Sequence, residues 1–141
     1  MECTIKWIDN MTFLAETGSG HVVAMDGAPD AGGRNLAPRP MELMLAGAGG
    51  CTAFDVVLIL KRGRHAITGC SVRLEAERAD ADPKSFTRIR FVYTVTGHNL
   101  KKEAVERAVH LSAEKYCSAS IMLAKSAEMI HEVEIVEAAQ G

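Results

Sequence analysis

Cysteine is the residue type in this 141-residue chain that could carry out redox chemistry, and the chain holds four. They are widely spaced, with no C-x-x-C pair, at Cys3, Cys51, Cys70 and Cys117. The N-terminus has no basic segment followed by an apolar stretch, so we expect a cytoplasmic protein without a signal peptide. Its thiols should be reduced at rest, and a disulfide would form only as part of a reaction. Structural zinc sites use closely spaced ligand pairs, so we expect no metal and no other cofactor.

Cys51 follows a glycine-rich stretch of a predicted helix, in which Gly47, Gly49 and Gly50 fall within four positions. A helical glycine costs about 1 kcal/mol relative to alanine, so such a run is typical of a close approach by another backbone. A second copy of the same helix, crossing at a two-fold axis, would provide it and would place Cys51 near a homodimer contact. Taken alone, a single cysteine in an apolar helix is more often a small buried hydrophobic residue.

Cys117 lies where a second predicted helix ends, among small polar residues. A cysteine at such a junction is expected to be more exposed and movable than one inside a strand. With Cys51 it could form a peroxidatic and resolving pair, in which a thiolate attacks a peroxide and the sulfenic acid condenses with the second thiol. Spacing alone does not establish this pairing. Cys3 and Cys70 fall in predicted strands and are expected to be structural.

The composition is that of an ordinary folded protein. Apolar residues make up 48% and charged residues 24% of the chain, which excludes a disordered protein. The net charge of −2 and the lack of a basic stripe argue against nucleic acid or an anionic membrane as partners. The longest apolar region, 43–60, contains Asp55 and many small residues, which favours a buried helix over a membrane span. His110 and Glu114 could share a helix face, and a solvated pair is the favoured interpretation.

The apolar pattern predicts a single α+β domain spanning residues 1–141, with an antiparallel sheet. Its central element is a helix from Met41 to about Lys61, which is apolar all round and is therefore expected to be buried. A second helix should run from Leu100 to about Tyr116, with Asn99 as its N-cap. Strands are expected near residues 3–8, 11–15, 22–25, 72–77, 88–95 and 130–136, and a short helical piece near 121–124.

Three motifs, taken in this order, resemble the OsmC and organic hydroperoxide resistance (Ohr) family, and most closely its YhfA-like subgroup. They are P-M-E-L at 40–43, A-G-A-G-G-C at 46–51 and Y-C-S at 116–118. The likeness covers nearly the whole chain, including the order of the elements. It implies an OsmC-like fold, an interlocked homodimer with two active sites at the interface, and a preference for organic hydroperoxides over hydrogen peroxide. By position, Cys51 matches the peroxidatic cysteine and Cys117 the resolving one.

The carboxylate near the start of the central helix departs from the family pattern. Family members commonly carry a catalytic Glu directly after the Pro, whereas here Met41 follows Pro40 and the carboxylate is Glu42. In a straight helix Glu42 and Cys51 would lie about 13 Å apart along the axis and on opposite faces. Glu42 would then serve the partner's site if the two helices run antiparallel. The alternative is an ordinary first-turn Glu favoured by the helix dipole.

The family also uses an Arg to hold the thiolate. No Arg precedes Arg34 in this chain, which excludes an arrangement with an early Arg. Arg39 is preferred over Arg34 because it adjoins Pro40 and is thereby tied to the start of the helix, although either could be a solvated surface residue. Ser118 replaces the Pro that usually follows the second cysteine.

The sequence therefore predicts a thiol-dependent peroxidase for organic hydroperoxides, active in oxidative-stress defence. Cys51 is the nucleophile, an Arg stabilises its thiolate, Glu42 orients that Arg, and Cys117 resolves the sulfenic acid. The resemblance implies a dithiol reductant, either a lipoylated protein or a thioredoxin-like protein. The alternative is a non-enzymatic dimeric redox sensor or a module that binds an apolar ligand. For the peroxidase, an apolar lining from Met44, Leu45 and Phe54 would suit an organic hydroperoxide better than a small polar one.

Overall fold

The alternating apolar residues near the N-terminus form a three-stranded antiparallel sheet, as the sequence predicts. The computed structural model describes residues 1–140 and divides the chain into two compact units, Met1–Ala46 and Gly47 onward. The first unit contains β1 (Cys3–Asp9), β2 (Thr12–Thr17) and β3 (Val22–Met25), in the order β1-β2-β3. The boundary between the two units falls inside the helix of residues Pro40–Arg62. A single domain over residues 1–141 stays a prediction.

The second unit is built on a sheet of three long strands, in the order β4-β5-β6. β4 (Ala66–Arg78) pairs antiparallel with β5 (Phe86–His98), whereas β6 (Glu128–Glu137) pairs parallel with β5. The prediction of an antiparallel sheet was therefore wrong for β6. The chain between β5 and β6 crosses back along the sheet through helical segments, so that β6 starts at the same end as β5.

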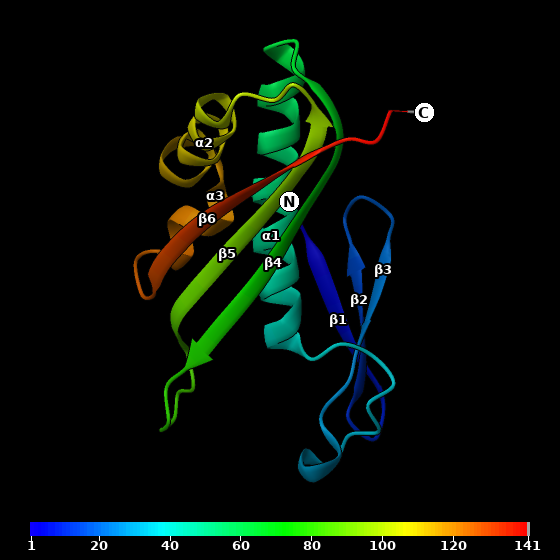
Figure 1. Cartoon of the computed structure of the whole chain (residues 1–141). Coiled ribbons are helices and arrows are strands. Elements are labelled where there is room, and N and C mark those ends of the chain that lie inside the picture. Colours follow the sequence, from blue (N-terminus) through cyan, green and yellow to red (C-terminus); the bar gives the residue numbers. More distant parts are fainter. Residues whose placement is uncertain (141) are drawn as a thin grey trace. The chain divides into compact units, whose positions relative to one another are not determined.

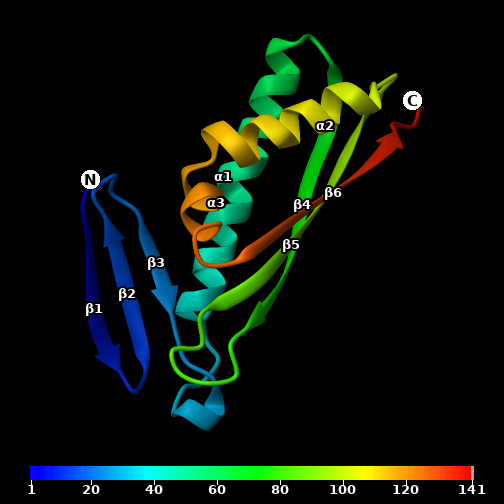
Figure 2. The ribbon, with the colours of Figure 1, turned by 90° about the vertical axis from the view of Figure 1, so that its left-hand side faces the viewer.

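Helices cover one face of this second sheet (Figures 1 and 2). α1 runs over Pro40–Arg62, α2 over Lys102–Leu111 and α3 over Ser118–Leu123, with a π-helical turn, Ser112–Tyr116, directly after α2. Asn99 is not the N-cap of α2: that position is Lys101, and Asn99 adopts a left-handed φ of 52° before the helix starts. The single predicted helix from Leu100 to Tyr116 is thus shorter and ends in a π turn.

The core of the second unit lies between the sheet and these helices. Ile89, Phe91, Tyr93 and Val95 alternate along β5, and each is completely buried on the helix-covered face. The opposite face carries charged side chains that pair across strands, with Arg90 contacting both Glu75 of β4 and Glu132 of β6. Burial on one face and charge on the other explain most of the alternation in this strand, which Val92 interrupts as a buried apolar residue in register with Arg90.

α1 is buried on one side only in the single chain, so this chain by itself does not bury the helix as the sequence predicts. Its buried residues follow a spacing of about one turn and are Ala48, Gly49, Thr52, Val56 and Leu60. The helix is long and apolar enough to cross a membrane by length and composition, with a mean hydropathy of 2.0 over 18 residues, of which 28% are buried. A helix in a protein core passes the same test, so this finding is weak support for a membrane span.

Candidate redox site

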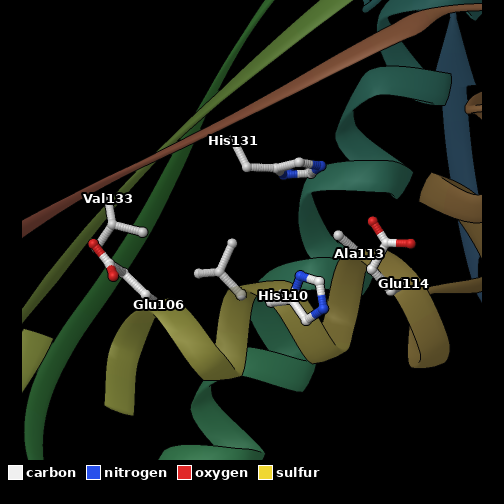
Figure 3. A pocket seen from close by; sticks show the side chains of 7 residues that line it. Glu106, His110, Ala113, Glu114, His131 and Val133 are labelled. Carbon is white, nitrogen blue, oxygen red and sulfur yellow. The ribbon is translucent and has the colours of Figure 1, made fainter. Parts of the chain in front are cut away.

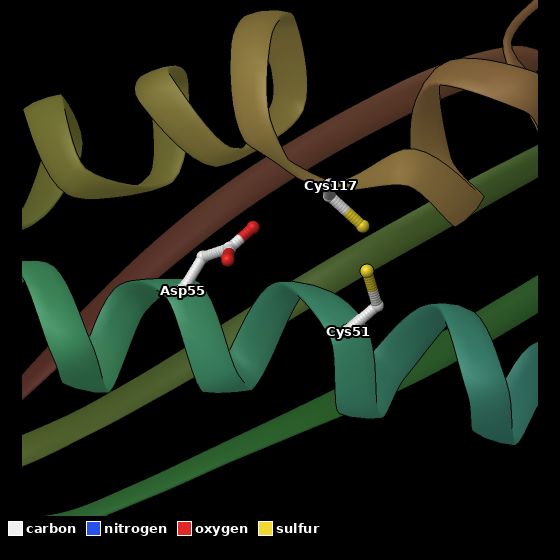
Figure 4. Close-up of side chains that lie close together, drawn as sticks. All are labelled: Cys51, Asp55 and Cys117. Atoms are coloured by element: carbon white, nitrogen blue, oxygen red, sulfur yellow. The ribbon is translucent and has the colours of Figure 1, made fainter.

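Two of the predicted site residues, Cys51 and Cys117, are brought together in the second unit, 66 positions apart in the sequence. The carboxylate of Asp55 joins them, and the two sulfur atoms and one Asp55 oxygen all lie within 4.8 Å of one another. Figure 4 shows the two sulfurs facing each other, with the Asp55 side chain beside them. Both cysteines are free thiols in this structure. The cluster can therefore hold a dithiol, and a carboxylate lies within reach of its protons.

Helix geometry and a tight turn position these three groups. Cys51 and Asp55 are four residues apart on α1 and so share a face of that helix. Cys117 is the N-cap of α3, and its backbone N–H donates to the Ser112 carbonyl at 2.8 Å, which closes the π turn. Its sulfur donates to the Ser120 hydroxyl at 3.0 Å and accepts from the Ser120 N–H at 3.3 Å. π turns are frequent at functional sites, and here the turn delivers the second thiol to the first.

Cys117 is completely buried, whereas Cys51 is partly accessible. The prediction that Cys117 would be more exposed than a cysteine inside a strand was wrong, because the junction between α2 and α3 folds inward against α1, where Ser112 bonds Thr52 and Asp55. Burial raises the pKa of the Cys117 thiol, and the nearby Cys51 adds to this effect, although the hydrogen bonds between Cys117 and Ser120 act in the opposite direction. Cys117 therefore favours its protonated form.

A continuous series of hydrogen bonds, buried at its centre and part-buried at its ends, extends from Asp55. The Ser112 hydroxyl donates to the Asp55 carboxylate at 2.9 Å and lies 2.8 Å from the Thr52 hydroxyl. Thr52 is in turn 2.9 Å from the Tyr93 hydroxyl, which lies 3.1 Å from Nδ1 of His131. Within residues 1–140, no buried side-chain nitrogen or oxygen lacks a partner. These side-chain hydrogen bonds thus link α1, the π turn, β5 and β6 to one another.

The bond from Ser112 to Asp55 fixes which atom donates in every other hydrogen bond of this series. Each hydroxyl has one proton, and Ser112 gives its proton to the carboxylate, so its oxygen must accept from Thr52. Thr52 must then accept from Tyr93, and Tyr93 must accept from an N–H at Nδ1 of His131. Burial raises the pKa of Tyr93 to about 12, so this phenol keeps its proton and can donate at neutral pH. The network therefore fixes both the His131 tautomer and the orientation of Asp55.

His131 lies beside a surface pocket between α2 and β6 (Figure 3). The pocket has a volume of about 270 Å³, and its titratable lining residues are Glu106, His110, Glu114 and His131. Burial lowers the pKa of His131, and the charge of Glu114 opposes that shift. The ring also stacks on Phe91, with centroids 4.8 Å apart. His110 and Glu114, expected as a solvated pair, thus share this pocket with a half-buried imidazole.

The predicted Arg and Glu belong to the first unit. The Glu42 carboxylate accepts from the Arg39 backbone N–H at 2.9 Å and lies 3.4 Å from its guanidinium. These contacts lower the pKa of Glu42 and cap the start of α1. Arg34 pairs with Asp9 at 2.7 Å instead. Arg39 and Glu42 thus contact each other in the first unit, and Cys51 and Cys117 lie close together in the second. A functional role for Arg39 and Glu42 stays a prediction.

Sequence reasoning missed the groups around the thiols. The sequence could have identified Asp55 as a neighbour of Cys51. It is the one carboxylate in the apolar stretch 43–60, and it follows Cys51 by one helical turn. Thr52 sits beside the cysteine and gave a weaker signal. Ser112, Tyr93 and His131 gave none, because only the fold brings them together. Cys3 is exposed on β1 and Cys70 is half-buried on β4, and neither belongs to the cluster.

Comparison with known proteins identifies relatives over nearly the whole chain. The "OsmC-like protein" family matches residues 32–132. Protein YhfA of Escherichia coli (strain K12) is 48% identical over 138 residues, which cover 98% of this chain and all of YhfA. A solved structure of a hypothetical protein from Aquifex aeolicus VF5 is 29% identical, with a TM-score of 0.86, covering 98% of this chain and 97% of that one.

More distant structures share the fold alone. One is described as an organic hydroperoxide resistance protein OsmC, predicted redox protein, from Legionella pneumophila. It is 17% identical with a TM-score of 0.69 and covers 95% of this chain and 97% of its own. The family match spans well over half of the chain, and the full-length identity to YhfA agrees with it. The chain therefore belongs to the OsmC-like protein family.

Proposed function

We propose that this protein is a thiol-dependent peroxidase that reduces organic hydroperoxides through Cys51 and Cys117. The observation that carries the proposal is the placement of the two sulfurs within 4.8 Å of each other, one partly accessible and one completely buried. An accessible thiol can meet a peroxide, while a buried thiol is protected from it and can react only with its neighbour. The membership of the OsmC-like family and the description of the Legionella relative support a role in hydroperoxide resistance.

The proposed reaction has two steps at sulfur. The Cys51 thiolate attacks the outer peroxide oxygen, so that an S–O bond forms and the O–O bond breaks; the alkoxide that leaves takes one proton from water and becomes the alcohol. The Cys117 sulfur then attacks Cys51, so that the S–S bond forms, the S–O bond breaks and water leaves. A dithiol reductant, lipoylated or thioredoxin-like, restores both thiols and is itself oxidised to a disulfide. One hydroperoxide thus consumes two electrons and two protons.

Asp55 is the proposed proton acceptor for the second step. Cys117 must lose its proton to attack, and burial raises the pKa of this thiol. The Asp55 carboxylate lies within 4.8 Å of that sulfur and is held in place by the Ser112 hydroxyl. A carboxylate at this position can take the thiol proton as the S–S bond forms and return it to the leaving oxygen.

Arg39 and Glu42 are proposed to complete the site from a second copy of the chain. Their contact at the start of α1 supports the proposal that Glu42 orients the Arg39 guanidinium toward a thiolate. The glycines of α1 support a homodimer, since a Cβ added to Gly47 or Gly50 would meet no atom within 4 Å in the single chain. Phe54 on the same helix is 68% exposed. A partner helix packed on these residues would bury them at little steric cost.

The test is steady-state consumption of cumene hydroperoxide with dithiothreitol as the reductant. Wild type should turn over, Cys51→Ser should be inactive, and Cys117→Ser should react once and stop as a sulfenic acid that dimedone traps. Cys70→Ser is the matched control and should keep wild-type turnover, because Cys70 lies outside the cluster. Turnover that survives in Cys51→Ser, or a wild type that oxidises without turning over, would contradict the proposal; the second result would favour a redox sensor.

A further inference from the structure

We propose that the reduced Cys51–Cys117–Asp55 cluster binds one Zn²⁺ ion, through two thiolate sulfurs and one carboxylate oxygen. The inference concerns metal binding and does not require peroxidase activity. Only its regulatory consequence, that zinc and hydroperoxide exclude each other at the thiols, rests on the proposed function.

The ligand types and their separation fit zinc. Zinc forms bonds of about 2.3 Å to thiolate and about 2.0–2.2 Å to carboxylate, in a tetrahedral arrangement. Ligand atoms of such a site lie about 3.5–3.8 Å apart, as those bond lengths require. The three candidate atoms already lie within 4.8 Å of one another, so side-chain adjustments of about 1 Å would complete the geometry. Two sulfurs and one oxygen favour zinc over calcium or magnesium, which prefer oxygen alone.

Two of the three ligands are held by hydrogen bonds in a way that suits a metal site. The Ser112 hydroxyl orients Asp55, and behind it the Thr52 and Tyr93 hydroxyls orient Ser112. The Ser120 N–H points at the Cys117 sulfur and would stabilise its thiolate. Such supporting hydrogen bonds fix ligand direction before the metal arrives and commonly account for 10–100-fold in affinity, as an order of magnitude.

The fold creates this site from ligands that the sequence spacing separates. Cys51 and Asp55 supply a pair from one turn of α1, and Cys117 is added by the inward fold between α2 and α3. A search for closely spaced cysteines and histidines finds no such site, which explains why the sequence predicted no metal. With three protein ligands, a fourth position stays available for water.

Zinc at this position would cover both thiols at once. A metal-bound Cys51 thiolate shares its lone pair with the metal and is a poorer nucleophile, so that bound zinc should slow the attack on a peroxide. Once the S–S bond has formed, two of the three ligands are lost, and the oxidised protein should not hold the ion. The site would thus keep the dithiol reduced while zinc is available.

The test is a zinc titration of the full-length protein, reduced with a phosphine and stripped of metal, in competition with a chromophoric chelator. Wild type should bind one Zn²⁺ per chain, and the disulfide form should bind none. Cys51→Ser and Cys117→Ser should each weaken binding by about 100-fold or more, and Asp55→Asn by about 10-fold or more. Cys70→Ser, at a half-buried thiol outside the cluster, should bind within about 2-fold of wild type.

Two further measurements make the result decisive. Thermal melting of each metal-free variant shows whether it folds. Co²⁺ in place of Zn²⁺ should give a thiolate-to-metal charge-transfer band in wild type, and full intensity of that band should require both Cys51 and Cys117. Fully reduced wild type that binds no zinc would overturn the inference. Wild-type affinity in a folded Asp55→Asn variant would also overturn it, because the dithiol alone would then explain the binding. Neither result would bear on peroxide turnover, which is measured without metal.

Discussion

The two faces of the β4–β5–β6 sheet both carry polar side chains that pair across elements, but they do so in opposite surroundings. On the helix-covered face, Thr52, Tyr93 and Ser112 form a buried hydrogen-bonded chain between Asp55 and His131. On the open face, Arg90 pairs with two carboxylates in contact with solvent. A buried polar group that loses its partner pays the full cost of its desolvation, whereas water replaces a lost partner on an open face.

Of the two faces, the helix-covered one fixes the position of the thiols. The buried chain ties together the α1 residues next to Cys51 and the π turn that precedes Cys117. Because each hydroxyl has one proton and each is fully paired, the chain tolerates few alternatives. The ion pairs on the open face serve solubility and strand pairing and lie on the far side of the sheet from the cysteines.

The largest effect is expected from Thr52→Val, which keeps the shape of the side chain and removes the centre of the buried chain. It leaves the Tyr93 and Ser112 hydroxyls each short of a partner, so the free energy of unfolding should fall by about 2–3 kcal/mol. Urea unfolding measures this. The matched control is Thr94→Val on the open face, where the hydroxyl bonds Glu134 at 3.4 Å in contact with solvent. It should change stability by no more than about 0.5 kcal/mol. Equal losses in both variants would refute the comparison.

A pH dependence of intermediate size is expected from His131. Burial lowers the pKa of this imidazole, so the unfolded state binds the proton more readily than the folded state does. Stability is therefore fully present above the unfolded pKa of about 6.5 and is lost as the pH falls through the lower, folded pKa. Glu114 opposes the shift, and Glu106 and His110 share the pocket.

The measurement for His131 is the thermal midpoint between neutral pH and pH values below about 6.5. His131→Gln should lose less stability on acidification than wild type does. His98→Gln, at an exposed position at the end of β5, is the control and should follow the wild-type curve. A His131→Gln curve as steep as that of wild type would show that other groups cause the acid sensitivity.

The smallest effect is expected from Arg90→Gln on the open face. The guanidinium contacts Glu75 and Glu132, and these contacts lower the pKa of Glu132, but all three side chains are exposed to water. Unfolding by urea should show a loss smaller than that of Thr52→Val, and the loss should shrink further in high salt, which screens exposed ion pairs. A salt-independent loss as large as that of Thr52→Val would mean that the open face also anchors the fold.

Much of the fold could be predicted from the sequence, because each element carries its own periodicity. The alternation in β4 and β5 and the position of Pro40 at the first turn of α1 gave these elements directly. The direction of β6 could not be predicted in this way, since parallel and antiparallel pairing leave the same pattern in a strand of this length. The one-sided burial of α1 in the single chain was also missed, because the helix is apolar on every face and only its glycines indicate a contact with a second copy.

Some residues of the candidate site could be predicted from the sequence, and others could not. Cys51 and Cys117 were predicted to act together only through the resemblance to a family, and the structure brings their sulfurs together. The burial of Cys117 was mispredicted, since local sequence does not report how the turn before α3 packs. Ser112, Tyr93 and His131 come from three separate elements, and their contacts exist only in the folded chain.

The pairing of Cys51 with Cys117 is tested most directly by mass spectrometry of the reduced protein after one equivalent of cumene hydroperoxide. Peptide mapping without reduction should find one disulfide, between Cys51 and Cys117 of the same chain, while Cys3 and Cys70 remain alkylatable. This result is expected because only these two sulfurs share the Asp55 cluster. Cys51 left unmodified, or joined to Cys70 in place of Cys117, would contradict the proposed peroxidase mechanism.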